Sequence, residues 1–194
     1  MYPIDHGLPY VYNYDELYHF TSRAITMLGG DLNPHYFDNP SALTYLIHLA
    51  LRFQYAGAWP FGELGGALRE LRADPSVAYL TGRSISTVLC MLAVASLFAV
   101  GKRLWGTAEG IAAAAVLCFA FLPVASSRLA LTDAGVLLPV SVAIYAIVKV
   151  REDGRRRYFV LAGAAIGLAV GFKYTAGLLV VPFLVAAASR APRD

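Results

Sequence analysis

The feature that most constrains this chain is a series of apolar runs that begins at Leu80 and continues almost to its end. Short polar joints separate five such runs, at residues 80–101, 107–125, 134–150, 158–172 and 174–189. Most of them are near the lower end of the roughly 17–25 residues with which a helix crosses the hydrocarbon of a bilayer. Only 15% of the 194 residues are charged, against about 25% in an ordinary soluble domain. We therefore expect an all-α protein, a polytopic bundle of about five membrane-spanning helices.

The last two runs meet at Phe172-Lys173-Tyr174 without a loop between them. We interpret this joint as a tight hairpin between two helices; one long bent helix over residues 158–189 is the alternative. The fourth run is rich in glycine and alanine, and such small residues allow helices to approach closely in lipid. We interpret them as packing residues and not as a nucleotide-binding loop.

Basic residues fall at alternate joints between the runs. They follow the first, third and fifth runs, as Lys102, Arg103, Lys149, Arg151, Arg155, Arg156, Arg157, Arg190 and Arg193. Cytoplasmic loops carry the excess of Lys and Arg in membrane proteins, so these joints indicate a multi-pass protein, in our interpretation of a bacterial inner (plasma) membrane. Contact with anionic membrane lipid accounts for the arginines. A nucleic-acid partner is not expected, because the longest basic run has three residues and no aromatic platform.

Residues 1–79 differ in composition from the rest of the chain. They hold eight acidic and four basic residues, a net charge of −4, whereas residues 80–194 hold five and twelve, a net charge of +7. All four histidines and nine of the twelve tyrosines also lie in the first 79 residues. We therefore expect two unlike parts: an extracytoplasmic first loop over residues 1–79, which carries the polar chemistry, and a membrane part over residues 80–194.

A short amphipathic helix is predicted near the start of the first loop. Apolar residues at helical spacing follow Asp15, and the glycine pair at residues 29–30 marks the end of the helix. In the first turn, unpaired backbone N–H groups and the helix dipole would favour the ionised Asp15 carboxylate. Asp15 is therefore a candidate for both a helix cap and a general base, and helix physics alone favours the cap.

A second short helix is predicted over about residues 41–55. His48 and Arg52 interrupt its hydrophobic pattern, so it suits a membrane interface better than a span. Residues 56–79 contain several glycines and prolines among charges, which is typical of a loop, and we expect one helical turn there near residues 67–72.

Several local patterns occur in order along the chain. They are Tyr14-Asp15-Glu16, residues 30–37 (GDLNPHYF), Asn39-Pro40-Ser41, Arg128 with Thr132-Asp133, and Gly167-Leu168-Ala169 followed by residues 173–177 (KYTAG). Over essentially the whole chain, these patterns resemble the polytopic, lipid-carrier-dependent glycosyltransferases of the C-type (GT-C) fold, close to the protein O-mannosyltransferase and aminoarabinose transferase group. The resemblance implies a membrane enzyme that moves a sugar, with inversion, from a polyprenyl-phosphate donor to an acceptor protein, glycolipid or glycan on the outer face.

The resemblance also assigns roles to three carboxylates. Asp15 matches the acidic motif of the family's first outer loop, whose carboxylate acts as general base or organises the acceptor, and Glu16 supports it. Asp133 matches the second acidic position, at the outer mouth of the next helix pair. These roles make chemical sense because an acceptor hydroxyl has a very high pKa, so its proton must be accepted as the new bond forms.

The departing group is a lipid phosphate, which needs cations near its oxygens. Arg128 and Lys173 are the candidates, and His35 is a further one from the second loop motif. Each has a plainer alternative: Lys173 at a span end can snorkel to head groups, Arg128 can pair with Asp133, and His35 can serve packing. Tyr14, Tyr36 and Tyr174 lie within the same motifs and are the expected substrate contacts.

No cofactor is required by this interpretation, although a divalent metal ion is an alternative. Asp15 and His19 are four residues apart on the predicted helix and could share an ion, yet no HxxxH or HxxE pair is present. Family members differ in whether they use one.

Two departures from the family pattern concern the ends of the chain. Family members have a membrane anchor before the acidic loop and further spans after the fifth run, whereas Asp15 comes only fourteen residues after Met1 and the chain ends at Asp194. We expect a fragment of a longer membrane enzyme that is inactive by itself. The competing hypothesis is a non-catalytic membrane subunit or a transporter segment, although a transporter usually places ionisable residues in the middle of its helices.

Overall fold

The computed structural model describes residues 3–56 and 64–189. Every regular element in these residues is a helix, which confirms the all-α class. In chain order they are the π-helix η1 (Glu16–Thr21), α1 (Ser22–Thr26), the 3₁₀-helix η2 (Met27–Gly29), α2 (Ala42–Ala56), α3 (Gly65–Ala73), α4 (Ser76–Leu104), α5 (Thr107–Phe119), α6 (Phe121–Ser126), α7 (Thr132–Asp153), α8 (Arg156–Phe172), the 3₁₀-helix η3 (Tyr174–Leu179) and α9 (Val180–Ala188).

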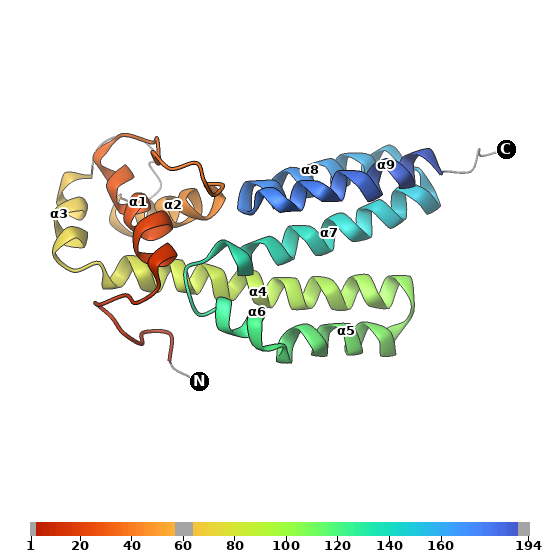
Figure 1. Cartoon of the computed structure of the whole chain (residues 1–194), viewed down its shortest axis with the longest axis horizontal. Coiled ribbons are helices and arrows are strands. Elements are labelled where there is room, and N and C mark those ends of the chain that lie inside the picture. Colours follow the sequence, from red (N-terminus) through yellow and green to blue (C-terminus); the bar gives the residue numbers. More distant parts are fainter. Residues whose placement is uncertain (1–2, 57–63, 190–194) are drawn as a thin grey trace.

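The long helices form an antiparallel bundle (Figure 1). Helix α4 packs against α5 and α7, and α7 packs in turn against α8 and α9. Glycines bring α4 and α5 together, since a Cβ atom added to Gly101 would lie 2.8 Å from the Cα atom of Gly110. Small residues at such a crossing allow the two backbones to approach closely in lipid.

The two ends of the bundle carry different segments. The α4–α5 and α7–α8 joints and the end of α9 lie at one end, which we call the basic end (Figure 1). The α6–α7 and α8–η3 joints lie at the opposite end, beside the N-terminal helices. The structure thus separates the described basic joints from the first loop, as the alternation of charge predicts.

The predicted apolar runs correspond to helices, with one change in the second run. The second run is divided at Ala120, where the backbone is extended (φ −64°, ψ 131°) between α5 and α6. The fourth and fifth runs are divided at Lys173, which is also extended (φ −151°, ψ 121°). The hairpin interpretation of this joint is therefore confirmed, and the single long bent helix is wrong.

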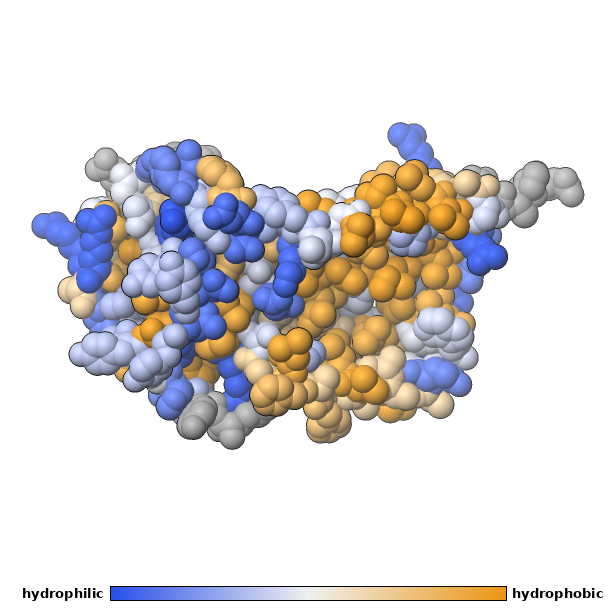
Figure 2. Space-filling model, viewed as in Figure 1, coloured by the Kyte–Doolittle hydropathy of each residue, from blue (hydrophilic) through white to orange (hydrophobic). Residues whose placement is uncertain are grey.

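Two helices in the described part of the chain, α4 with 29 residues and α7 with 22, are long and apolar enough to cross a membrane. Helix α5 and the segment Tyr174–Ala188 are apolar but shorter, and α8 has 17 residues. Figure 2 shows apolar surface over the bundle and hydrophilic residues over the N-terminal helices and the far end. This distribution is typical of a membrane protein, and the count of five spans stays a prediction.

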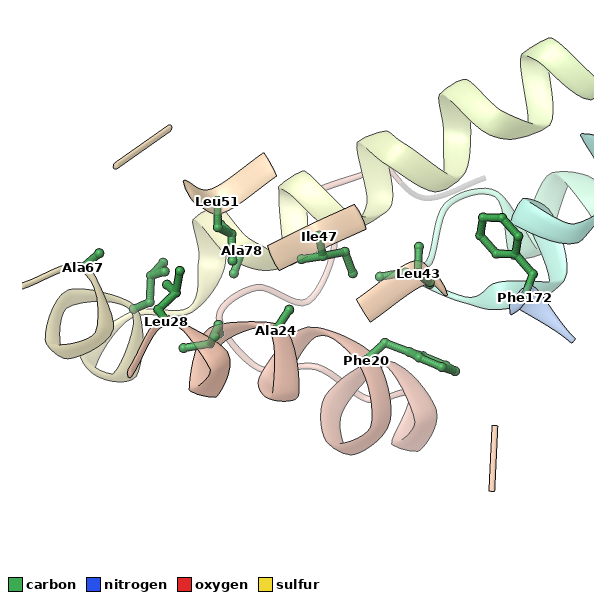
Figure 3. Close-up of a cluster of buried hydrophobic side chains, with 12 residues drawn as sticks. Phe20, Ala24, Leu28, Leu43, Ile47, Leu51, Ala67, Ala78 and Phe172 are labelled. Atoms are coloured by element: carbon green, nitrogen blue, oxygen red, sulfur yellow. The ribbon is translucent and has the colours of Figure 1, made fainter. Parts of the chain in front are cut away.

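The N-terminal helices enclose a small core of their own. Elements η1, α1 and η2 form one continuous helix that ends at Gly30, whose positive φ of 101° closes it as predicted. Figure 3 shows its apolar face turned toward α2, with Phe172 of α8 at the edge of the same cluster; the labelled residues are Phe20, Ala24, Leu28, Leu43, Ile47, Leu51, Ala67, Ala78 and Phe172. This core fixes the N-terminal helices to the end of the bundle.

Residues 64–79 differ from the loop that the sequence predicts. Helix α3 has nine residues instead of one turn, and α4 begins at Ser76, before the first apolar run. Buried Ala67 and Leu71 hold α3 against the N-terminal core. Tertiary packing therefore outweighs the glycine-rich composition at this place.

Helix α2 has its polar interruptions on the inside. His48 and Arg52 are buried, and the Nδ1 atom of His48 donates to the carbonyl oxygen of Ala24 at 3.1 Å. Its exposed face carries large apolar residues instead, namely Tyr45, Leu46, Leu49 and Phe53. The interfacial role predicted for this helix stays a prediction, with these exposed residues as the face that would meet lipid.

Candidate active site

The first candidate catalytic residue along the chain is Asp15, in the turn that leads into η1. Asp15 lies in this turn with its side chain 57% exposed. It makes no capping hydrogen bond; instead the Oδ1 atom of Asn13 accepts the backbone N–H of Glu16 at 3.0 Å. The prediction that Asp15 caps the helix is therefore wrong, because Asn13 fills that position and leaves the Asp15 carboxylate accessible.

Glu16 is fully buried and forms an ion pair with Arg83 of α4. Arg83 donates from Nε at 2.7 Å and from Nη2 at 2.9 Å, one bond to each carboxylate oxygen. The backbone N–H of Ala130 adds a bond of 2.9 Å to the same carboxylate. Arg83 also donates to the carbonyl oxygens of Ile4 and His6. One buried pair thus ties the N-terminal segment, η1, α4 and the segment before α7 together.

Arg83 was not among the site residues predicted from the sequence. It lies in an apolar run, and a charged residue in such a run needs a partner, which is the signal that could have singled it out. The identity of the partner could not be read in the same way, because Glu16 is 67 positions away.

A cluster of rings forms around His19, next to Asp15. The Nε2 atom of His19 lies 3.7 Å from its Oδ1 atom. The His19 ring stacks on Tyr36 with centroids 4.2 Å apart and an interplanar angle of 6°, and it meets the edge of Tyr14 at 5.1 Å. The structure therefore brings together three predicted site residues, Tyr14, Asp15 and Tyr36, around a histidine that sequence reasoning had considered only as a metal ligand.

The segment of residues 31–40, which we call the linking loop, holds Tyr36 in place. The guanidinium of Arg23 lies 5.0 Å from the Tyr36 ring centroid and donates to the carbonyl oxygens of Pro34 and His35 at 2.7 and 3.0 Å. Asn39 donates to the Tyr36 hydroxyl at 2.7 Å. These contacts fix the ring that stacks on His19.

His35 lies in the left-handed region of the backbone (φ 51°), and its ring hydrogen-bonds Asp31 at 2.7 Å. This hydrogen bond, with a second from the Asn33 backbone, lowers the pKa of Asp31 below its usual value. Both side chains are exposed. The structure pairs His35 with Asp31 and not with Asp15, so the two predicted site residues are in separate groups.

The opposite side of the linking loop meets the α8–η3 joint. Lys173 forms an ion pair with Asp133, in the first turn of α7. The Tyr174 hydroxyl donates to the carbonyl oxygen of Phe37 at 2.9 Å. Lys173 also lines a groove of about 340 Å³ between α7 and η3, whose other lining residues are Val136, Val140, Thr175, Ala176, Leu178 and Leu179. Lys173 is thus paired with a carboxylate at the mouth of an apolar groove.

Arg128 lies half-buried in the turn between α6 and α7. Two residues later, the N–H of Ala130 binds Glu16, so this turn is fixed against η1. Tyr36 and Phe37 are neighbours in sequence, and they contact the Asp15 group and the Lys173 group respectively. The linking loop therefore joins two polar groups that come from distant parts of the chain.

Asp15 and His19 are the two side chains that the sequence suggested as metal ligands. A protein metal site usually provides three or more ligands, and no group of three or more His, Cys, Asp or Glu side chains comes together within the described residues. The residues present thus offer at most part of a metal site, and a divalent ion stays a hypothesis.

The comparison with protein families gave one informative match. The family described as dolichyl-phosphate-mannose-protein mannosyltransferase matches residues 77–193. This stretch includes Arg128, Asp133 and Lys173, whereas Asp15 precedes it. Comparison with curated proteins and with solved structures gave no significant match. Because the match covers more than half of the chain and agrees with an all-α bundle rich in apolar helices, the chain belongs to this family of mannosyltransferase-like, GT-C type membrane glycosyltransferases.

Proposed function

We propose that this protein acts in the transfer of a sugar from a polyprenyl-phosphate donor to an acceptor hydroxyl or amine on the outer face of the membrane. One observation carries the proposal: residues beside an accessible carboxylate, Asp15, and an accessible ammonium, Lys173, contact the same loop at one end of the bundle. His19, next to Asp15, stacks on Tyr36 of this loop, and Tyr174, next to Lys173, donates to Phe37. The transfer of a sugar from a phosphate needs a base for the acceptor and a cation for the leaving group.

In this proposal Asp15 is the general base. The acceptor oxygen or nitrogen attacks the anomeric carbon from the side opposite the phosphate and gives its proton to Asp15. The bond from the anomeric carbon to the phosphate oxygen breaks, and the phosphate leaves with the electron pair, so the configuration is inverted. We assign Glu16 a positioning role, since its buried carboxylate is bound by Arg83 and Ala130. Asp15 is the neighbour that it holds in place.

The donor site in this proposal centres on Lys173. A polyprenyl phosphate combines an anionic head with a long apolar chain, and the groove beside Lys173 combines an ammonium with apolar walls. The donor phosphate would replace Asp133 as the partner of Lys173, which leaves Asp133 available to the acceptor or the sugar. Arg128 and His35 are further contacts for the phosphate from the same end of the bundle.

The acceptor would meet the aromatic surface beside Asp15. Tyr14 and Tyr174 are exposed. The His19 ring contacts Tyr14 and stacks on Tyr36 of the linking loop, and Tyr174 donates to Phe37 of the same loop. Flat rings with polar edges suit sugars, which present apolar faces and hydroxyl groups. A protein, a glycolipid or a glycan would fit this description equally.

The roles assigned here need no metal ion. We therefore expect transfer to persist in EDTA.

The test measures sugar transfer from labelled polyprenyl-phosphate sugars in membranes that contain the product of the whole natural gene. We expect Asp15→Asn to lower the rate by about 10²-fold or more, because the acceptor loses its proton acceptor. Asp5→Asn, which changes another exposed aspartate of the same segment, is the matched control and should keep the rate. Abundance is matched between variants.

A second pair of variants examines the donor site. Lys173→Gln should raise the KM for the donor, whereas Lys102→Gln at the basic end should leave it unchanged. Transfer at the normal rate by Asp15→Asn would remove Asp15 from the role of base. A protein without transfer in any version, under conditions in which labelled donor is consumed by a known transferase, would favour the membrane subunit or transporter segment instead.

A further inference from the structure

A narrow groove lies between α4 and α7 at the basic end of the bundle, opposite the candidate active site. It has a volume of about 340 Å³ and is lined by Ser96, Ala99, Val100, Arg103, Val142 and Tyr145. Its α4 residues lie within the eight positions from Ser96 to Arg103, a length of about 10 Å along the helix. The Ser141 hydroxyl donates to the Ser96 hydroxyl at 2.9 Å, so this polar pair at the inner end is satisfied. The remaining wall is mainly apolar.

The charge at the mouth of this groove is positive. Arg103 is exposed and has no carboxylate within ion-pair distance among the residues that the structure describes. Lys149 is buried close by and already pairs with Glu152, so this carboxylate is engaged. The charges of Arg103 and Asp153 also act on Lys149, with opposite signs. An anion at the mouth would supply the partner that Arg103 lacks.

We propose that this groove binds one anionic phospholipid of the surrounding membrane. Its phosphate bonds to the Arg103 guanidinium, and one acyl chain lies along Ala99, Val100 and Val142 toward Ser96. A free phosphate ion would meet the charge but leave the apolar wall uncovered, so a lipid is the ligand that satisfies both. The α4–α5 joint beside this groove is at the opposite end of the bundle from the α8–η3 joint and the N-terminal helices (Figure 1), and this inference does not depend on the proposed sugar transfer.

The test counts bound lipids by native mass spectrometry on the purified chain in a nonionic detergent. Dioleoyl phosphatidylglycerol and dioleoyl phosphatidylcholine, which differ in head-group charge, are the two probes. We expect the chain to retain one phosphatidylglycerol at concentrations at which phosphatidylcholine is lost. Arg103→Gln should weaken phosphatidylglycerol binding by about tenfold, the usual effect of losing a charge-assisted bond.

Two variants make the result specific. Lys102→Gln removes the same charge one residue away, where the side chain lies over Phe98 and does not line the groove, and it should change binding less than twofold. Ala99→Phe fills the groove at an exposed position, and it should abolish binding while Arg103 remains. An equal loss in both charge variants, equal binding of the two lipids, unchanged binding by Ala99→Phe, or displacement by inorganic phosphate would overturn the proposal.

Discussion

At the scale of single residues, the buried ion pair between Glu16 and Arg83 determines whether the site can form. Arg83→Met leaves the Glu16 carboxylate buried without its cation, which costs about 3–5 kcal/mol in such pairs and lowers Tm on the order of 10 °C in a chain of this size. Thermal unfolding in detergent measures the change. Asp31→Asn, which breaks the exposed pair with His35, is the control and should leave Tm nearly unchanged. A similar Tm for both variants would contradict the structural role of Arg83.

His48 should make stability depend on pH. Burial lowers its pKa below the ordinary value of 6.5, and the nearby Arg52 charge acts in the same direction. Below about pH 6.5, His48 is therefore protonated in the unfolded chain but stays neutral in the folded chain. The contribution of His48 to the free energy of unfolding is fully present above that pH and decreases as the pH falls toward the folded pKa.

The measurement is Tm from about pH 7.5 down to about pH 5. His48→Asn, whose amide can still donate to the Ala24 carbonyl oxygen, should be less stable at neutral pH and should show a flatter pH dependence. His35→Asn, on the exposed surface, should still lose stability on acidification. An unchanged slope in His48→Asn would show that another group causes the dependence.

At the scale of elements, one glycine controls how α7 meets α8. A Cβ atom on Gly135 would lie 2.5 Å from the ring of Phe172, which is buried beside Lys173. Gly135→Ala should therefore displace Phe172, cost about 1–3 kcal/mol through overpacking, and weaken the Asp133–Lys173 pair. Gly163→Ala, where nothing lies within 4 Å of the new atom, should keep or slightly raise stability. Equal Tm values in thermal unfolding would contradict this packing.

The elements whose boundaries depend on nearby residues were predicted from the sequence. The glycine pair at residues 29–30 marked a helix end, and the apolar runs marked the long helices. Helix α3 was underestimated because its stability comes from packing of Ala67 and Leu71 against the N-terminal core. This tertiary contact cannot be predicted from the glycine-rich composition of the segment.

The candidate site was predictable only in part, for a similar reason. The motifs indicated Asp15, Asp133 and Lys173, but the partners of these residues come from tertiary contacts over long sequence distances. The pairing of Lys173 with Asp133 and the stacking of His19 on Tyr36 required the fold. The pairing of Arg83 with Glu16 could not be predicted, because the two residues are 67 positions apart.

At the scale of the whole molecule, the apolar band in Figure 2 and the separation of the two ends in Figure 1 support a membrane protein with a first loop on one side. The side is testable with single cysteines in a chain whose Cys90 and Cys118 are replaced by alanine. A membrane-impermeant maleimide should label Asp38→Cys on intact cells. It should label Arg155→Cys only after permeabilisation. Labelling of both, or of Arg155→Cys alone, would contradict the proposed orientation.

The π-helix that carries His19 also bears on how this loop tolerates changes in length. A π-helix closes its hydrogen bonds one residue further along than an α-helix, so residues 16–21 contain a position that can be deleted by returning the turn to α-helical geometry. The Asn13 cap before it and the buried Ala24 after it could then keep their places. Insertions and deletions should therefore accumulate in this turn rather than around it. In an alignment of relatives, a gap of one residue here would mark a change of helix type and not a misplaced motif.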